Sequence, residues 1–252
     1  MKKCLVIGVV LTALWSCQSD DAPAYTATPM PLDIPAFFAS SILPPVIPRD
    51  NPQSVEGVAL GKKLFYDPIL SANGTQACAD CHLPSNSFTD NRQYSIGSEG
   101  DVGTRNSMPL FNIAWNFEQR FFWDGAEATL ENQIFEPVMN PTEMNNTWRN
   151  VTESLDASPI YPELFSAAFG TTKIDSVGVS KAIAQFLRTL ISSNAKFDRH
   201  LTDQVPLTPE EQRGLAIFLD ESRGDCFHCH GNPNTPLWTD NRFHNNGLDE
   251  FF

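Results

Sequence analysis

Apolar residues recur at helical spacing in the second half of the chain. Seven of them lie on one face of a helix between residues 179 and 191: Val179, Ala182, Ile183, Phe186, Leu187, Leu190 and Ile191. Tyr161–Phe169 predicts a shorter helix that ends at Gly170. We find no convincing period-two alternation, and the connecting segments are rich in Asn, Gly, Pro and Ser. The pattern therefore predicts an all-α fold with long loops.

A capping box at Thr208-Pro-Glu-Glu211 predicts a further helix with proline at its first position. Its apolar side would carry Leu215, Phe218 and Leu219, and the helix can end at Gly224.

The chain contains an internal repeat around two Cys-x-x-Cys-His pentapeptides. Gly61-Lys-Lys-Leu-Phe65 precedes the first, and Gly214-Leu-Ala-Ile-Phe218 precedes the second. An aromatic-Thr-Asp tripeptide follows each of them, as Phe88-Thr-Asp90 and Trp238-Thr-Asp240. The repeat predicts two similar helical domains in tandem. The first would comprise residues 54–204, and the second, which looks incomplete, residues 205–252.

The first 16 residues have the pattern of an export signal. Lys2 and Lys3 precede an apolar stretch, Cys4–Leu14, that is too short to span a bilayer comfortably. This stretch leads to Leu14-Trp-Ser-Cys17, which resembles a bacterial lipobox, in which the cysteine is lipidated. A lipidated Cys17 would attach the protein to a membrane without spanning it. An ordinary signal peptide that is cut nearby is the alternative.

Residues 17–53 are rich in proline, which fixes φ and removes a hydrogen-bond donor. They predict an extended tether between the anchor and a globular body. Phe37, Phe38, Ile42 and Leu43 can nevertheless pack against that body.

Composition limits the function classes. The 252 residues are 41% hydrophobic, enough for a buried core, and 19% charged, which argues against wholesale disorder. The net charge of −13 excludes a broad nucleic-acid-binding face. It would suit a basic protein partner, or it simply keeps the protein soluble.

Four of the six cysteines belong to the two pentapeptides, Cys78-Ala-Asp-Cys81-His82 and Cys226-Phe-His-Cys229-His230. Two thiols three positions apart can each add to one vinyl group of a haem, and the next residue brings an imidazole under the iron. We therefore expect two covalently bound c-type haems, with His82 and His230 as iron ligands and His228 as a spacer.

Three other uses of a Cys-x-x-Cys pair fit less well. A zinc site built from two pairs usually separates them by about 15–20 residues, whereas most of the first domain intervenes here. A thioredoxin-like redox pair would lie in a βαβ pattern. A disulfide is compatible with an exported protein but gives no reason for the histidine that follows both pairs.

A longer series of motifs resembles one family. In order along the chain we find Leu60-Gly-Lys-Lys-Leu-Phe65, Asp67-Pro68, Leu70-Ser71, the first pentapeptide, Arg105-Asn106, Phe122-Trp-Asp-Gly125, Leu130 with Gln133, and Pro141-Thr-Glu-Met144. From about residue 54 onward the chain is similar to the bacterial dihaem cytochrome c peroxidases, which include the tryptophylquinone-maturing dihaem enzymes. The resemblance implies two cytochrome c-like α domains with one haem each. It also implies reduction of hydrogen peroxide to water with electrons from a small cytochrome c or cupredoxin.

The resemblance also assigns residues to parts of the reaction. The haem on His82 would be the peroxide site, and the haem on His230 would receive electrons. Glu143 matches the distal acid–base residue, which could take a proton from bound peroxide and return it to the departing oxygen. Gln133 matches a second distal-pocket residue, and Trp123 matches the tryptophan that could relay electrons between the haems. A solvated loop glutamate is the alternative interpretation of Glu143, whereas a core position in the Phe-Phe-Trp run is compatible with the relay role of Trp123.

The sequence departs from the family pattern at three places. Many members have a histidine after Ser-Ile-Gly that ligates the resting peroxidatic iron, but this chain has Ser98 there, so we expect an open sixth position at the first haem. Ala126 stands where arginine is usual. Members also continue well past the equivalent of Phe252. They supply there a sixth ligand for the second haem and complete a calcium site, of which Asn106 matches one ligand. We therefore expect this chain to be part of a longer product.

The leading hypothesis is thus a dihaem cytochrome c peroxidase of the periplasm or cell envelope. We expect it to contact a membrane only through the lipid anchor and to bind no nucleic acid, with a homodimer as one candidate assembly. Two alternatives stay open. One is a dihaem electron carrier without peroxidase activity, and the other is a dihaem oxidase that acts on a protein side chain.

Overall fold

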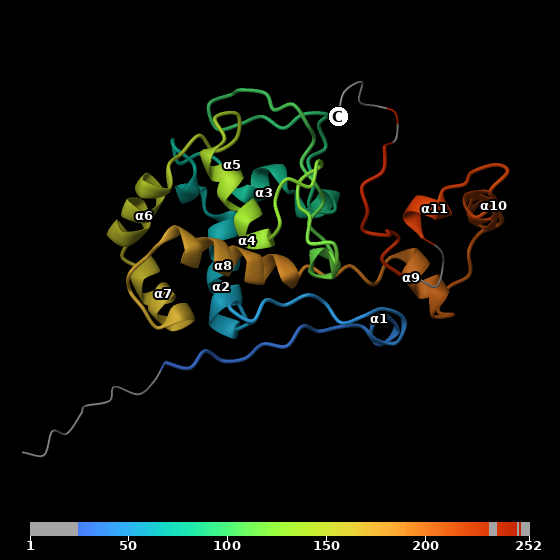
Figure 1. The fold of residues 1–252 in the computed structure, drawn as a ribbon, viewed down its shortest axis with the longest axis horizontal. Helices are drawn as coiled ribbons and strands as arrows, with labels where there is room; N and C mark the ends of the chain where they lie inside the picture. Colours follow the sequence, from blue (N-terminus) through green and yellow to red (C-terminus); the bar gives the residue numbers. More distant parts are fainter. Residues whose placement is uncertain (1–24, 232–235, 246, 248–252) are drawn as a thin grey trace, which may run out of the picture.

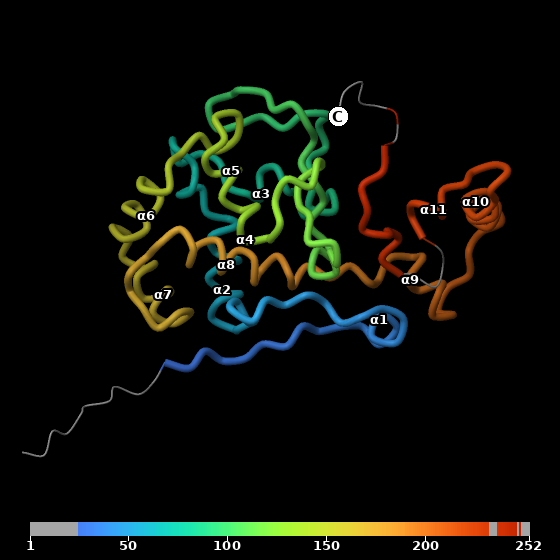
Figure 2. The backbone as a smooth tube through the Cα atoms, in the orientation of Figure 1, coloured from blue at the N-terminus to red at the C-terminus, as the bar shows by residue number. Residues whose placement is uncertain are grey.

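The computed structural model describes residues 25–231, 236–245 and 247 (Figure 1). Their helices are α1 (Ala36–Ser41), α2 (Val55–Tyr66), α3 (Cys78–Cys81), α4 (Leu130–Gln133), α5 (Phe135–Met139), α6 (Trp148–Ala157), α7 (Tyr161–Phe169), α8 (Ser176–Arg188), α9 (Lys196–Leu201), α10 (Pro209–Phe218) and α11 (Phe227–His230). Single 3-10 turns lie at Pro68–Leu70, Pro84–Asn86 and Ile113–Trp115. The described residues form only isolated β-bridges and no sheet, which confirms the predicted helical fold. Figure 2 shows the long loops, above all the one between α3 and α4.

Helices α2 and α8 cross at the centre of the larger body (Figure 1). Gly61 on α2 lies directly against α8, since a Cβ built on Gly61 would be 1.8 Å from the Ala182 carbonyl oxygen. α8 begins after Asp175, whose carboxylate accepts a hydrogen bond from the Gly178 backbone N at 2.8 Å. Its apolar face is buried, from Val179 to Leu187. The helix predicted from the apolar stripe is confirmed, although it ends at Arg188.

Local signals place two other helix ends correctly. α7 ends at Gly170, which adopts a left-handed conformation with φ of 70°. At the start of α10 the Thr208 hydroxyl accepts from the Glu211 backbone N, and the Glu211 carboxylate accepts from the Thr208 backbone N at 2.7 Å. This is the predicted capping box.

The other end of α10 differs from the prediction. The helix ends at Phe218 rather than near Gly224. The Asp220 side chain accepts hydrogen bonds from the Ser222 backbone N at 2.9 Å and from Arg223 Nε at 2.7 Å. These short-range bonds close the chain into a turn, because an aspartate competes with the helix for backbone donors.

Helices α9, α10 and α11 form a smaller lobe together with residues 236–245, to one side of the larger body (Figure 1). The Trp238 ring joins its parts, at 5.0 Å from the Phe197 ring centroid on α9 and 5.6 Å from that of Phe218 on α10. Residues 236–245 also reach the larger body, since a Cβ built on Gly125 would lie 3.0 Å from the Phe243 ring.

Residues 25–53 pack against the larger body and are not the extended tether that their prolines predict. Phe38 on α1 is fully buried and lies edge-on against Trp115, with 5.4 Å between ring centroids. Trp115 Nε1 donates to the Leu43 carbonyl at 3.1 Å, and Gln53 Nε2 donates to the Gln185 carbonyl on α8 at 2.8 Å. Burial of aromatic rings and of paired polar groups thus determines the path of this segment, which the proline content alone did not indicate.

Residues 1–24, which carry the predicted signal peptide and Cys17, lie outside the described residues. Among the helices that the structure describes, none has the length and apolar content needed to cross a bilayer.

We predict that Gly61→Ala lowers the free energy of unfolding by about 1–3 kcal/mol, because the added methyl group collides with the Ala182 carbonyl and forces α2 and α8 apart. The repeat provides a control at Gly214 in α10, where an added Cβ meets no atom within 4 Å. Gly214→Ala should leave stability unchanged or raise it by up to about 1 kcal/mol, since alanine favours helix. Urea unfolding followed by circular dichroism measures both. Equal losses at the two glycines would contradict a close contact specific to Gly61.

Candidate functional site

The first pentapeptide forms α3, a single turn that directs two thiols and an imidazole toward one hollow. The turn is closed by Asp80, whose carboxylate accepts from the Ala77 backbone N at 2.7 Å. His82 follows, and its Nδ1 lies 2.9 Å from the Phe88 carbonyl oxygen. Because a carbonyl oxygen only accepts, Nδ1 carries the proton and Nε2 keeps its lone pair. Burial lowers the pKa of His82, which keeps the ring neutral and suited to bind a metal through Nε2.

Neither thiol beside His82 is in a disulfide, and Cys81 Sγ accepts a hydrogen bond from Gln76 Nε2 at 3.6 Å. Cys78 and Cys81 are both free cysteines. Burial raises the pKa of Cys78 to about 12 and that of Cys81 to about 11. With no group bound, both thiols are therefore mainly protonated near neutral pH, unlike the low-pKa thiol of a redox-active pair. Within the described ranges, no three or more His, Cys, Asp or Glu side chains gather as a metal site. The redox-pair alternative thus finds no support at this pentapeptide.

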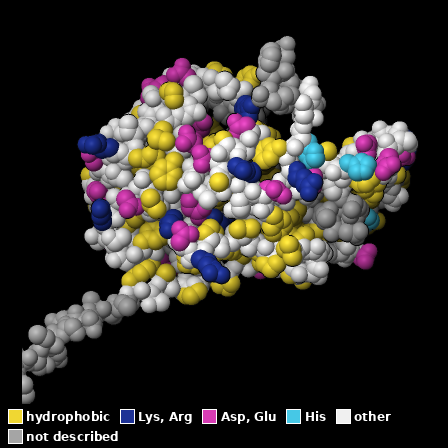
Figure 3. Space-filling view, in the orientation of Figure 1, with side chains coloured by type: hydrophobic (Ala, Val, Ile, Leu, Met, Phe, Trp, Pro, Cys, Tyr) yellow, Lys and Arg dark blue, Asp and Glu magenta, His cyan; other side chains and the backbone are white. Residues whose placement is uncertain are grey.

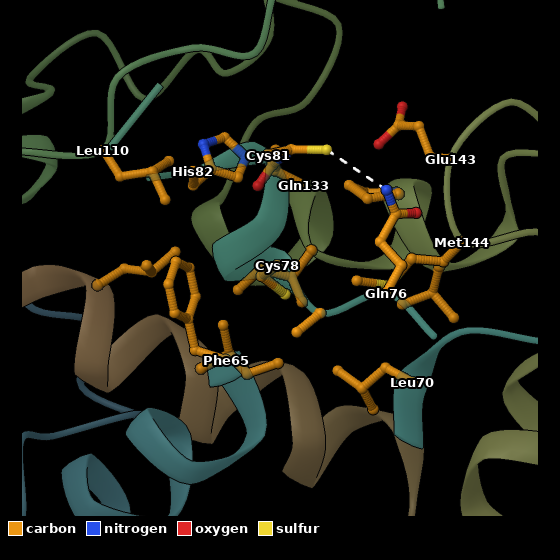
Figure 4. Close-up of a pocket in the computed structure, with 16 residues that line it drawn as sticks. Phe65, Leu70, Gln76, Cys78, Cys81, His82, Leu110, Gln133, Glu143 and Met144 are labelled. Atoms are coloured by element: carbon orange, nitrogen blue, oxygen red, sulfur yellow. Dashed lines mark hydrogen bonds between the residues drawn. The ribbon is translucent and has the colours of Figure 1, made fainter. Parts of the chain in front are cut away.

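The hollow that these groups face has largely apolar walls (Figure 4). It contains about 610 Å³ of space between atoms, including solvent at its mouth. Its apolar walls are Phe65, Leu70, Leu110, Ile134, Val138, Met144, Ile183 and Leu187. Gln76, Gln133 and Glu143 are polar side chains that also line it. The structure thus brings five of the predicted site residues together: Cys78, Cys81, His82, Gln133 and Glu143.

A tight turn after α5 places Glu143 at the hollow. Its backbone N donates to the Asn140 carbonyl at 3.0 Å, and its Oε1 accepts from Asn140 Nδ2 at 2.8 Å. Asn140 Oδ1 in turn accepts from the backbone N and the hydroxyl of Thr142, each at 3.0 Å. Burial raises the pKa of the Glu143 carboxyl, the Asn140 hydrogen bond opposes this rise, and the charge of Glu136 adds to it. Glu143 is therefore suited to exchange protons closer to neutral pH than an exposed glutamate.

Gln133 lies on α4, which a buried ion pair fixes to α8. Arg188 Nη1 lies 2.9 Å from Glu131 Oε1, and Arg188 Nη2 donates to Glu131 Oε2 at 3.0 Å. Asn51 Nδ2 also donates to Glu131 Oε1, at 2.6 Å. The Arg188 side chain is only 4% exposed, and removing one partner of such a buried ion pair would leave a buried charge uncompensated. The pair holds α4, and with it Gln133, at the wall of the hollow.

A second, more open hollow extends from Glu143 to Trp123 and Asn106. Trp123 is 51% exposed, so it is not a core aromatic in the described structure, and its Nε1 donates to the Asn106 carbonyl at 2.8 Å. The Asn106 side chain already has partners within the chain, since its Oδ1 accepts from the Thr89 hydroxyl at 2.9 Å and its Nδ2 donates to the Arg92 carbonyl at 2.6 Å. Calcium binding at Asn106 stays a prediction.

The second pentapeptide lies apart from the first hollow, in the smaller lobe (Figure 1). Cys229 and His230 are exposed, and Cys226 is half-buried. The His230 ring faces Phe218 on α10, with 6.3 Å between ring centroids. His228 pairs with Asp225. Figure 3 shows histidine side chains gathered on this side of the molecule.

Two functional contributors escaped the sequence-based prediction. The Asn140 side chain donates a hydrogen bond to the Glu143 carboxyl and so orients it. Asn140 lies three residues before Glu143 and is followed by a proline, a pattern that could have predicted an Asx turn. The Phe88 carbonyl orients His82, but a backbone carbonyl leaves no trace in residue identity.

Helices around an apolar hollow, with a Cys-x-x-Cys-His turn at its edge, are typical of cytochrome c-like haem proteins. The family model for di-haem cytochrome c peroxidase matches residues 55–205. The chain belongs to this family.

Individual relatives agree with this assignment. The chain is 38% identical over 240 residues to the methylamine utilization protein MauG of Methylorubrum extorquens, covering 94% of this chain and 65% of that protein. It is 37% identical over 195 residues to the cytochrome c peroxidase Ccp of Escherichia coli, covering 73% of this chain and 39% of that one. Among solved structures, a MauG-like protein associated with microbial copper homeostasis superposes with a TM-score of 0.75 at 34% identity, covering 85% of this chain and 61% of the other. The chain therefore spans less than two thirds of the length of these relatives.

We predict that Glu143→Gln stabilises the folded chain at about pH 7 but has little effect at about pH 4. Since folding raises the pKa of Glu143 above its ordinary value of 4.5, the folded state prefers the protonated carboxyl. Stability is therefore lost as the pH rises through the folded pKa, and glutamine escapes this loss because it cannot ionise. Thermal denaturation of both proteins at both pH values measures the difference. A variant less stable than the wild type at about pH 7 would show that folding favours the charged form instead.

Proposed function

We propose that this chain is the haem-binding part of a dihaem cytochrome c peroxidase, which reduces hydrogen peroxide to water with electrons from a small redox protein. The observation that carries the proposal is the half-buried Glu143 carboxyl in the same hollow as Cys78, Cys81 and His82. Relatives named cytochrome c peroxidase support it at 33–37% identity.

The residues at the first hollow fit a c-type haem. Cys78 and Cys81 would hold it through thioethers, His82 Nε2 would bind its iron, and the apolar walls would enclose the ring. The group would supply the iron at which the oxygen–oxygen bond of peroxide is broken. Cys226, Cys229 and His230 would hold a second haem in the same way, as the site where electrons enter.

Glu143 would handle the protons of the reaction. Its carboxylate can accept a proton from hydrogen peroxide and return it to the departing oxygen, which leaves as water. The Gln133 amide does not ionise and can position the peroxide by hydrogen bonds. One peroxide with two electrons and two further protons gives two waters, so the proposed electron donor completes the balance.

Trp123 would assist electron transfer between the two sites. It lines the open hollow together with Cys81 and His82. Its segment also touches the smaller lobe, where Gly125 meets the Phe243 ring. Both observations support a role for Trp123 as an electron relay between the two pentapeptides.

The loop that carries Ser98 supports an open sixth position at the first haem. Ser98 N donates to the Glu143 carbonyl at 2.7 Å, and its hydroxyl donates to the Met144 carbonyl at 3.2 Å. Gly97 packs so closely that an added Cβ would be 2.3 Å from the Thr142 carbonyl oxygen. The loop thus lies against the Glu143 turn without presenting an imidazole to the hollow.

Two other functions remain as alternatives. The 38% identity to MauG favours, as a second candidate, a dihaem oxidase that acts on a protein side chain. A dihaem electron carrier would leave the position and raised pKa of Glu143 without a use. We also propose that the protein is exported to the periplasm or cell envelope and is lipid-anchored at Cys17. A basic electron donor would suit the acidic chain, and calcium would bind near Asn106.

We predict that Glu143→Gln slows peroxide reduction by about 10²–10⁴-fold, because the proton acceptor is lost. The assay is peroxide-dependent oxidation of a reduced small cytochrome by the dihaem protein. Glu153→Gln, on the exposed side of α6, removes one negative charge elsewhere and should keep the wild-type rate. Equally slow wild-type and Glu143→Gln proteins would favour the electron carrier.

We predict that the fully ferric protein shows a five-coordinate, high-spin signal from the first haem without prior reduction, since no histidine of the Ser98 loop can ligate it. Electron paramagnetic resonance distinguishes this signal from that of the second haem. A purely low-spin, six-coordinate spectrum at the first haem would show that another group of the chain occupies the sixth position.

A further inference from the structure

The same five-residue turn follows both haem pentapeptides. Its two copies are Phe88-Thr-Asp-Asn-Arg92 and Trp238-Thr-Asp-Asn-Arg242. In the first copy the Arg92 backbone N donates to Asp90 Oδ1 at 3.0 Å, and in the second the Arg242 backbone N donates to Asp240 Oδ1 at 3.0 Å. In each turn Oδ1 of the aspartate therefore accepts the same backbone hydrogen bond. The turn itself makes no bond to the other carboxylate oxygen, Oδ2.

The surroundings of the two Oδ2 atoms differ. Asp90 is only 7% exposed, and its Oδ2 is buried with no hydrogen-bond partner among the described residues. The Asp240 side chain is 30% exposed, and its Oδ2 lies 2.8 Å from Nε2 of His244. The first turn thus contains a buried carboxylate oxygen without a hydrogen-bond partner. In the second turn the equivalent oxygen is paired with His244, and the aspartate side chain is partly exposed.

Hydrogen bonds connect Asp90 to both sides of His82. Its backbone N donates to the Ser107 hydroxyl at 2.7 Å, and that hydroxyl donates to the carbonyl of Cys81, the residue before His82, at 2.7 Å. Two residues before Asp90, the Phe88 carbonyl accepts the Nδ1 proton of His82. These bonds fix the backbone of Asp90 close to the proposed iron ligand, and solvent screens the charge of its buried carboxylate weakly.

We propose that Asp90 is an electrostatic tuning residue that lowers the reduction potential of the first haem, and that His244 weakens the same effect of Asp240 at the second. The inference rests on the two haem sites of the proposed function. A negative charge beside His82 favours the more positive, oxidised iron over the reduced one. It also polarises the Nδ1–H bond to Phe88, which makes the imidazole a stronger ligand donor.

The test is a spectroelectrochemical titration of the dihaem protein that resolves both haems. Asp90→Asn, which keeps the shape and removes the charge, should shift the midpoint potential of the first haem to a more positive value and leave the second unchanged. The matched variant Asp240→Asn should produce a smaller positive shift, at the second haem. His244→Gln should shift the second haem to a more negative value, because Asp240 Oδ2 loses the imidazole nitrogen that lies 2.8 Å from it.

The outcomes separate this inference from the proposed function. An unchanged first-haem potential in Asp90→Asn, or equal shifts in the two Asp→Asn variants, would overturn the inference. Haem content and circular dichroism show whether each variant folds. If Asp90→Asn does not bind haem, His244→Gln becomes the deciding variant. The inference is then overturned when His244→Gln fails to shift the second haem to a more negative potential. Peroxidase activity is measured separately, so the expected shifts in a protein without that activity would reject the proposed function alone.

Discussion

The contact between Gly61 on α2 and the Ala182 carbonyl on α8 determines the geometry of the first site. α2 leads directly into the loop that ends at α3 with its thiols, so its position sets where Cys78 and Cys81 lie. α8 carries Arg188, which holds α4 and Gln133 through Glu131. Both walls of the hollow therefore depend on one close backbone approach. Because protein interiors are densely packed, a shift at this crossing would move Cys78, Cys81 and Gln133 together.

Features set by interactions within a few residues could be predicted from the sequence. The end of α7 at Gly170 and the capping box of α10 involve backbone groups at most four positions away. The stripe of α8 could be recognised because helical periodicity is itself a local property. For the first site, the spacing of the pentapeptide identified Cys78 and His82, the resemblance identified Glu143, and the structure brings the three to one hollow. Here the family pattern supplied what spacing alone could not.

Features set by distant partners could not be predicted in this way. The prolines of residues 25–53 indicate local extension, but the path of this segment depends on Trp115 and Gln185, which lie far along the chain. The orientation of His82 depends on the Phe88 carbonyl, which any residue type would provide. Trp123 occurs in an aromatic run that suits a core, yet it is half exposed, and its indole N–H donates to the backbone carbonyl of Asn106.

The internal repeat shows how one motif can occur in two chemical environments. Both pentapeptides form a helical turn, and both are followed by an aromatic-Thr-Asp-Asn-Arg segment with the same backbone hydrogen bond to aspartate. Burial then differs, because Ser107 belongs to a long loop that folds over the first turn, whereas the second turn lies in a smaller lobe and its aspartate meets His244. Residue identity at the motif thus defines which group each site can hold. Elements outside the motif set the polarity and charge around that group, and these control its chemistry.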